Sequence, residues 1–118
     1  SATGTIRRHP DVARLKTAAD VNKLAKVQDR LFSAAVDMVR PGGVAVYCSC
    51  SLEPEEGPER IKAALDSGLP IERAPIGPGE LGGMEELTNT EGDLRTLPSH
   101  FAGQGGMDGF FAARLKRN

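Results

Sequence analysis

The chain has 118 residues, of which 39% are hydrophobic and 26% are charged, and its formal net charge is -1 at pH 7. This length is enough for one domain with a modest core and too short for two. The near-neutral charge is not typical of a free-standing nucleic-acid-binding protein. The sequence has neither an apolar run near the roughly 18 residues of a membrane span nor the apolar core of a secretory signal, so we expect a cytoplasmic protein.

Residues 1–17 show little helical periodicity and carry a basic cluster, Arg7, Arg8 and His9. We interpret this segment as a loop that leads into a short turn near residues 12–16. Guanidinium groups offer forked donors to phosphate oxygens, so the cluster is a candidate contact for a nucleic acid. Ion pairing with acidic residues of the same fold is the alternative, and the sequence leaves both open.

An amphipathic helix is predicted from Ala18 to Arg40. Its apolar residues recur at steps of three and four, which is typical of a helix that packs on a sheet; they are Val21, Leu24, Val27, Leu31, Ala35 and Met38. Asp20 is the predicted N-cap, and Pro41 with Gly42 ends the helix. We expect this helix to serve packing and to carry no catalytic residue.

The apolar run over residues 44–48 predicts a strand buried on both faces of a parallel sheet. Both cysteines of the chain lie where this strand should end. Cys50 falls just beyond its carboxyl end, the edge at which open α/β sheets bind ligands and present catalytic side chains. We therefore predict Cys50 as a candidate nucleophile and Cys48 as a buried, inert thiol of the strand.

Neither a disulfide framework nor a metal site is predicted for these cysteines. Strand residues two apart point the same way, so reduced thiols are expected. With His9 and His100 they make a nominal tetrahedral set for zinc. However, Cys-x-Cys lacks the usual spacer and the two histidines are isolated, so we expect no metal.

A second helix is predicted over residues 54–67, since Pro54 is favourable in a first turn and Gly68 ends the helix. Its N-terminus would favour a nearby thiolate, whereas the acidic residues Glu53, Glu55, Glu56 and Glu59 would oppose it. The sequence does not show which of these two effects on the thiolate is larger. Ser51 either orients the loop or caps this helix, and capping is the favoured interpretation.

Three further strands are predicted, over residues 71–74, 94–97 and 109–115. The first two are separated by a loop rich in proline and glycine over residues 75–83. A basic tail follows the last strand.

Four stretches of the chain resemble motifs of one known family. VYCSCSLEPEE, residues 46–56, closely resembles the Thr-Cys-Ser motif of the Sun/Nop family of RNA cytosine methyltransferases. Residues 1–11, 39–43 and 106–111 also agree with that family, at its order and approximate spacing. One departure is Ser49, which stands in place of the usual Thr and is likewise small and hydroxylated.

The resemblance implies a reaction and its parts. Cys50 would attack cytosine, S-adenosylmethionine would donate a methyl group to carbon 5, and the substrate would be RNA, with ribosomal RNA favoured. Arg7, Arg8 and His9 would contact that RNA.

The resemblance also implies the fold, an α/β architecture that forms the C-terminal half of a Rossmann-like methyltransferase sheet, with flanking helices and an antiparallel last strand. In the family, a glycine-rich cofactor loop, a second cysteine and an acid precede the position of Ser1. Residues 1–118 are therefore expected to be the C-terminal portion of a catalytic domain, without cofactor-binding residues and inactive alone.

Two other functions stay open at this point. One is a non-catalytic α/β RNA-binding or scaffold module that keeps the fold and uses its basic loops. The other is a metal-binding module. Activity and metal content of the intact protein would discriminate between these functions and methyl transfer.

Overall fold

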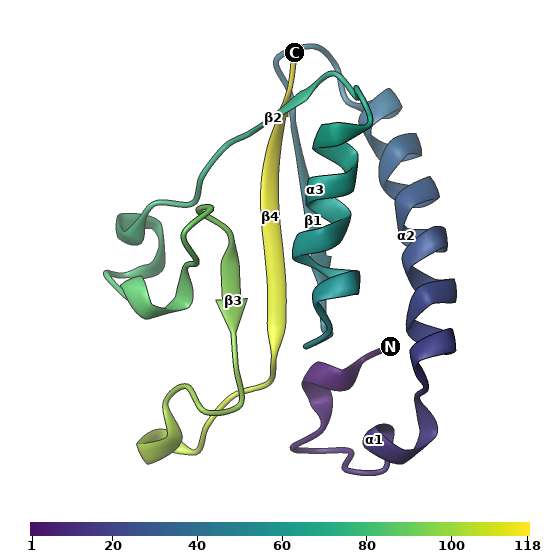
Figure 1. Ribbon diagram of the computed structural model, residues 1–118. Helices are drawn as coiled ribbons and strands as arrows, with labels where there is room; N and C mark the ends of the chain where they lie inside the picture. Colours follow the sequence, from purple (N-terminus) through teal and green to yellow (C-terminus); the bar gives the residue numbers. More distant parts are fainter.

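Strand β4 (Phe110–Arg117) is the central strand of a four-stranded antiparallel sheet (Figure 1). It pairs along one edge with β1 (Val44–Ser49). Along its other edge it pairs with β3 (Leu94–Thr96) near its beginning and with β2 (Ile71–Arg73) near its end. The antiparallel last strand and the mixed α/β architecture expected from the sequence are confirmed.

The computed structural model describes residues 1–118, apart from the side chain of Pro78. Its α-helices are α1 (Val12–Leu15), α2 (Ala18–Met38) and α3 (Pro58–Asp66), and its short 3₁₀ helices are η1 (Thr3–Thr5), η2 (Pro54–Glu56), η3 (Pro78–Leu81), η4 (Glu85–Leu87) and η5 (Ala102–Gln104). None of the described helices has the length and apolar character that crossing a membrane requires.

The core lies between one face of the sheet and helices α2 and α3. Alternate residues of β4 point into it, because side chains two apart in a strand share a face. The core cluster consists of Phe32, Val36, Tyr47, Ile61, Ala64, Ile71, Phe111, Ala113 and Leu115. The Tyr47 ring meets the rings of Phe32 and Phe111 edge-on, at centroid distances of 5.8 and 6.3 Å. Strand β1 is thereby joined to both a helix and the central strand.

Helix α2 begins with a capping box. The Thr17 side chain accepts a hydrogen bond from the backbone N–H of Asp20, and the Asp20 carboxylate accepts one from the backbone N–H of Thr17. The predicted N-cap was therefore wrong by one turn, since Thr17 is the cap and Asp20 is the third helical residue. The end of the helix at Met38 agrees with the prediction to within two residues.

The segment predicted as one helix over residues 54–67 is two elements. Helix η2 ends at Glu56, and α3 begins at Pro58. Proline has no backbone N–H to donate and disfavours helical angles in the preceding residue, so Gly57 adopts φ −133° and ψ −102° instead. A Cβ at this glycine would lie 3.0 Å from the Phe111 ring, so the break packs tightly against the central strand.

The expectation that β1 is buried on both faces of a parallel sheet was wrong. All its described partners are antiparallel, and the side chains of Val44, Val46 and Cys48 are exposed. These three residues alternate with Tyr47, which points into the core, so they point to the opposite face. For the same reason Cys48 is not the enclosed thiol that the sequence predicted.

Candidate active site

Cys50 is the first residue after β1, in the segment 50–57 that connects this strand to α3, which we call the thiol loop. Its side chain is exposed and its thiol is free. The position agrees with the prediction of a thiol just beyond the carboxyl end of the strand. Exposure makes Cys50 accessible to an electrophilic substrate, although Cys48 is exposed as well.

Two glycines fix the backbone beside the thiol. The N–H of Gly4 donates to the carbonyl of Cys50 at 2.8 Å, and the N–H of Gly109 donates to the carbonyl of Gly4 at 2.7 Å. A Cβ on Gly4 would lie 1.9 Å from the Gly109 oxygen and 2.7 Å from the Cys50 oxygen. Only glycine allows this three-segment contact, which we call the glycine clamp.

A chain of buried hydroxyl groups lies directly behind Cys50. The Ser51 hydroxyl donates to the Glu56 carboxylate at 2.5 Å and accepts from the backbone N–H of Glu53 at 3.0 Å. The Thr3 hydroxyl lies 3.2 Å from that of Ser51 and accepts from the backbone N–H of Leu52 at 2.9 Å. Ser51 has one proton and gives it to Glu56, so Thr3 is the donor to Ser51.

Glu56 is 0% exposed, and every contact of its carboxylate comes from a donor. Besides Ser51, the Ser1 hydroxyl donates, and Gln28 Nε2 donates at 3.2 Å. Burial raises the pKa of Glu56, but the hydrogen bonds from Ser1 and Ser51 outweigh burial and lower it. The carboxylate is therefore ionised and acts as acceptor only.

The backbone of the thiol loop has further support from Arg95 and Tyr47. Arg95 Nη1 donates to the Ser51 carbonyl at 2.8 Å, while its guanidinium lies 5.3 Å from the centroid of the Phe111 ring. The Tyr47 hydroxyl donates to the Glu56 carbonyl at 2.6 Å. Burial, followed by the charge of Glu56, raises the pKa of Tyr47 to about 12, so this hydroxyl keeps its proton.

The predicted RNA contacts Arg7, Arg8 and His9 lie together on the exposed loop after η1. Both arginines face one carboxylate, because Arg8 makes two hydrogen bonds to Asp108 and Arg7 Nη1 lies 3.6 Å from it. Arg7 also donates to the Gly105 carbonyl at 2.8 Å. The structure thus shows the ion pairing that the sequence left open, at a surface that remains accessible to solvent.

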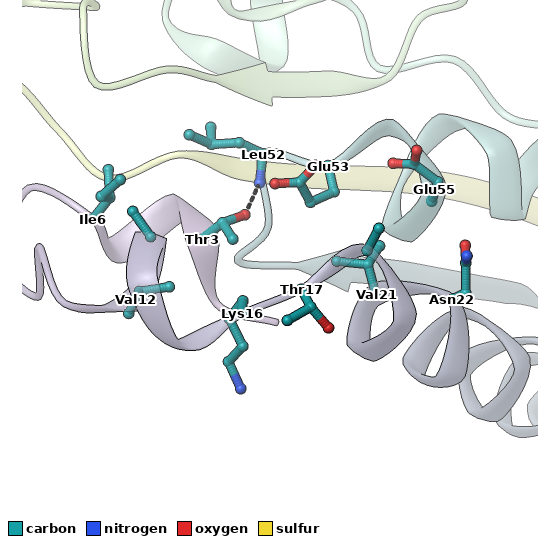
Figure 2. Close-up of a pocket in the computed structure, with 12 residues that line it drawn as sticks. Thr3, Ile6, Val12, Lys16, Thr17, Val21, Asn22, Leu52, Glu53 and Glu55 are labelled. Atoms are coloured by element: carbon teal, nitrogen blue, oxygen red, sulfur yellow. Dashed lines mark hydrogen bonds between the residues drawn. The ribbon is translucent and has the colours of Figure 1, made fainter.

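A cavity of about 420 Å³ lies beside the thiol loop, between η1, α1 and the start of α2. Figure 2 shows Leu52, Glu53 and Glu55 along one side of it, with Lys16 and Thr17 opposite. The dashed line marks the hydrogen bond from Leu52 to Thr3. Cys50 does not line this cavity.

Several residues of the site were missed or misjudged from the sequence. Ser51 does not cap a helix, since Glu53 and Gly57 are the N-caps of η2 and α3. Glu56 was considered only as one of four acidic residues that would oppose a thiolate, and Thr3 and Arg95 were not singled out. Only Thr3 and Glu56 had a signal in the sequence, because both lie inside motifs that resemble a known family; Arg95 had none. No group of three or more metal-ligating side chains is found among the described residues.

The carboxyl end of a strand in an α/β sheet is a position at which such folds present catalytic side chains, and Cys50 lies there. The family model described as 16S rRNA methyltransferase RsmB/F matches residues 1–116, and the chain belongs to this family. The resemblance to the Sun/Nop family is thereby confirmed. Ribosomal RNA small subunit methyltransferase B of Cronobacter sakazakii is 40% identical over 115 residues, which cover 98% of this chain and 24% of that protein.

Two solved structures share the fold. The crystal structure of PH0851 gives a TM-score of 0.83 at 25% identity, covering 98% of this chain and 24% of that chain. A methyltransferase homolog protein from Pyrococcus horikoshii gives 0.69 at 29% identity, covering 87% and 34%. The chain spans about a quarter of the length of the curated relatives that it matches.

Proposed function

We propose that the complete protein is an RNA methyltransferase that modifies carbon 5 of a cytosine in ribosomal RNA, and that residues 1–118 are the C-terminal portion of its catalytic domain. Cys50 is the nucleophile. The observation that carries this proposal is an exposed thiol on a loop whose backbone is fixed by the glycine clamp and by Arg95. Membership of a family described as 16S rRNA methyltransferases supports the reaction class.

The role of Cys50 follows from the chemistry of cytosine. Carbon 5 is a weak nucleophile, and addition of the Cys50 thiolate to carbon 6 forms a carbon–sulfur bond and makes the ring enamine-like, with electron density on carbon 5. After carbon 5 has gained its methyl group, a base removes the proton on that carbon. The carbon–sulfur bond then breaks and Cys50 leaves as a thiolate.

S-adenosylmethionine would supply the electrophilic methyl group. The residues of this chain do not fit a site for it. Among the described residues, one strand connects directly to an α-helix, from β1 to α3. This connection is filled by the buried side chains of Ser51 and Glu56. A glycine-rich loop that lets a cofactor approach the backbone is absent from this connection. We assign cofactor binding to residues outside this chain.

RNA would approach over the first third of the chain. Residues 1–40 carry eight Lys and Arg against four Asp and Glu, whereas residues 41–118 carry seven against twelve. Arg7, Arg8 and His9 belong to the basic third and are exposed. A guanidinium has five N–H donors, so an arginine held by Asp108 retains donors for a phosphate.

Methyl incorporation into RNA by variants of the complete protein tests the proposal. Cys50→Ala is expected to abolish incorporation, and Cys48→Ala is its matched control, with the same substitution at an exposed thiol two residues away. Retained incorporation by Cys50→Ala would overturn the proposal. A protein that binds RNA normally but shows no incorporation as wild type would instead be the non-catalytic module.

The RNA contact is tested separately by Arg7→Ala combined with Arg8→Ala. Loss of two phosphate contacts should weaken RNA binding. It should also reduce, by roughly 2, the magnitude of the slope of log K for RNA binding against log salt concentration. Lys116→Ala is the control, since this exposed lysine pairs in register with Val44 at the opposite end of β1 from Cys50. An unchanged affinity and slope in the double variant would remove these arginines from the RNA surface.

A further inference from the structure

The thiol loop is held from all sides while the side chain of Cys50 remains free. The carbonyl of Cys50 is fixed by Gly4 and the carbonyl of Ser51 by Arg95. The backbone N–H of Leu52 is fixed by the Thr3 hydroxyl. The Thr3 hydroxyl is in turn hydrogen-bonded to the Ser51 hydroxyl, which donates to Glu56.

Glu56 sets the direction of that chain. An ionised carboxylate has no proton to give, so it requires the Ser51 proton to point toward it. The Ser51 oxygen is then left as an acceptor for the N–H of Glu53 and for the Thr3 hydroxyl, and the Thr3 oxygen is left as an acceptor for Leu52. One buried acceptor thus determines the direction of both hydroxyl hydrogen bonds, from Ser51 to Glu56 and from Thr3 to Ser51.

The burial of the Glu56 carboxylate is unfavourable in free energy unless other interactions offset it. Removing an ionised carboxylate from water carries a penalty of several kcal/mol unless hydrogen bonds replace the lost hydration. Glu56 recovers that penalty from the Ser1 hydroxyl, the Gln28 amide and the Ser51 hydroxyl, which come from three separate segments. An apolar side chain could fill the same space more cheaply, but it could not orient Ser51.

We propose that Glu56 is a positioning residue for Cys50: through the Ser51 hydroxyl it fixes the backbone of the thiol loop and hence the point from which the thiol meets its substrate. This inference rests on the proposed function, in which Cys50 is the nucleophile. Glu56 is buried and makes no hydrogen bond to the Cys50 thiol, so it acts only through Ser51 and the loop backbone.

Glu56→Gln in the complete protein tests the inference. The amide keeps the shape of the side chain, but its NH₂ group replaces a carboxylate oxygen that accepts hydrogen bonds, and so places donors against donors. We expect kcat for methyl incorporation to fall by roughly 10- to 100-fold, the size expected for a displaced reacting group, while KM for RNA stays within about twofold. Glu59→Gln is the matched control, since Glu59 is exposed and makes no side-chain hydrogen bond or ion pair among the described residues.

Ser51→Ala is a second, smaller perturbation that removes the same link from its other end. Because both residues act through one contact, the double variant should be scarcely slower than the slower single variant, whereas independent effects would multiply. A folded Glu56→Gln with wild-type kcat, or effects that multiply fully, would overturn the inference. If Glu56→Gln does not fold, an unchanged kcat in Ser51→Ala overturns it and a lowered kcat with unchanged KM supports it.

The two proposals fail in different ways. Activity in Cys50→Ala would remove the nucleophile and the proposed function with it. An inactive Cys50→Ala beside fully active Glu56→Gln and Ser51→Ala would leave the proposed function standing and remove only the positioning role.

Discussion

Replacing Gly4 with alanine should break the glycine clamp. The added Cβ would lie 1.9 Å from the Gly109 carbonyl oxygen and 2.7 Å from that of Cys50, and both are backbone atoms that cannot move aside as a flexible side chain would. The two hydrogen bonds of the clamp contribute about 0.5–1.5 kcal/mol each. Overpacking costs about 1–3 kcal/mol in addition. We therefore expect Gly4→Ala to lower the free energy of unfolding by about 2–6 kcal/mol.

Urea unfolding followed by far-ultraviolet circular dichroism measures this loss. Gly103→Ala is the matched control, because a Cβ at Gly103 would meet no atom within 4 Å and the residue is exposed. It should stay within about 1 kcal/mol of wild type. In the complete protein, Gly4→Ala should also lower kcat, since the clamp holds the carbonyl of Cys50. If Gly4→Ala were as stable and active as Gly103→Ala, the clamp would not support the site.

Three further outcomes are expected. The folded pKa of Glu56 lies below its ordinary value of 4.5, so its stabilisation is present above that pH and is lost as pH falls through the folded value; the stability difference between wild type and Glu56→Gln should shrink as pH falls below about 4.5, and a difference that grows as pH falls would contradict this. Cys48→Ala should change stability by less than about 0.5 kcal/mol, because Cys48 is exposed, and a loss above about 2 kcal/mol in urea unfolding would show that it is packed. Calorimetry should detect no binding of S-adenosylmethionine to the 118-residue chain, and micromolar affinity would show that the cofactor site was misplaced.

Sequence periodicity and turn chemistry predicted the main elements because their causes are local. The apolar steps of α2 and the glycine and proline at its end are sufficient to place that helix. The proline at position 58 was equally visible, and its effect on Gly57 explains why one predicted helix became two. The position of Cys50 beyond β1 was likewise a local property of the strand boundary.

The buried network could not be predicted, because it depends on segments that meet only in the fold. Thr3 and Ser51 are 48 residues apart, and Gln28 and Glu56 are 28 apart. Nothing local distinguishes Glu56, with 0% exposure, from the exposed Glu59 three residues later. The exposure of Cys48 was missed for a similar reason, since alternation in a strand shows which residues share a face but not which face is covered.

Trapping on RNA that contains 5-fluorocytosine tests the central claim, the nucleophilic role of Cys50, most directly. The fluorine at carbon 5 cannot leave as the proton does, so the bond between Cys50 and carbon 6 should persist and be seen as a protein–RNA adduct. With the complete protein and S-adenosylmethionine, we predict that wild type and Cys48→Ala form the adduct, that Cys50→Ala does not, and that mass spectrometry places the modification on Cys50. An adduct on Cys48, or one that forms in Cys50→Ala, would contradict the assignment of the nucleophile.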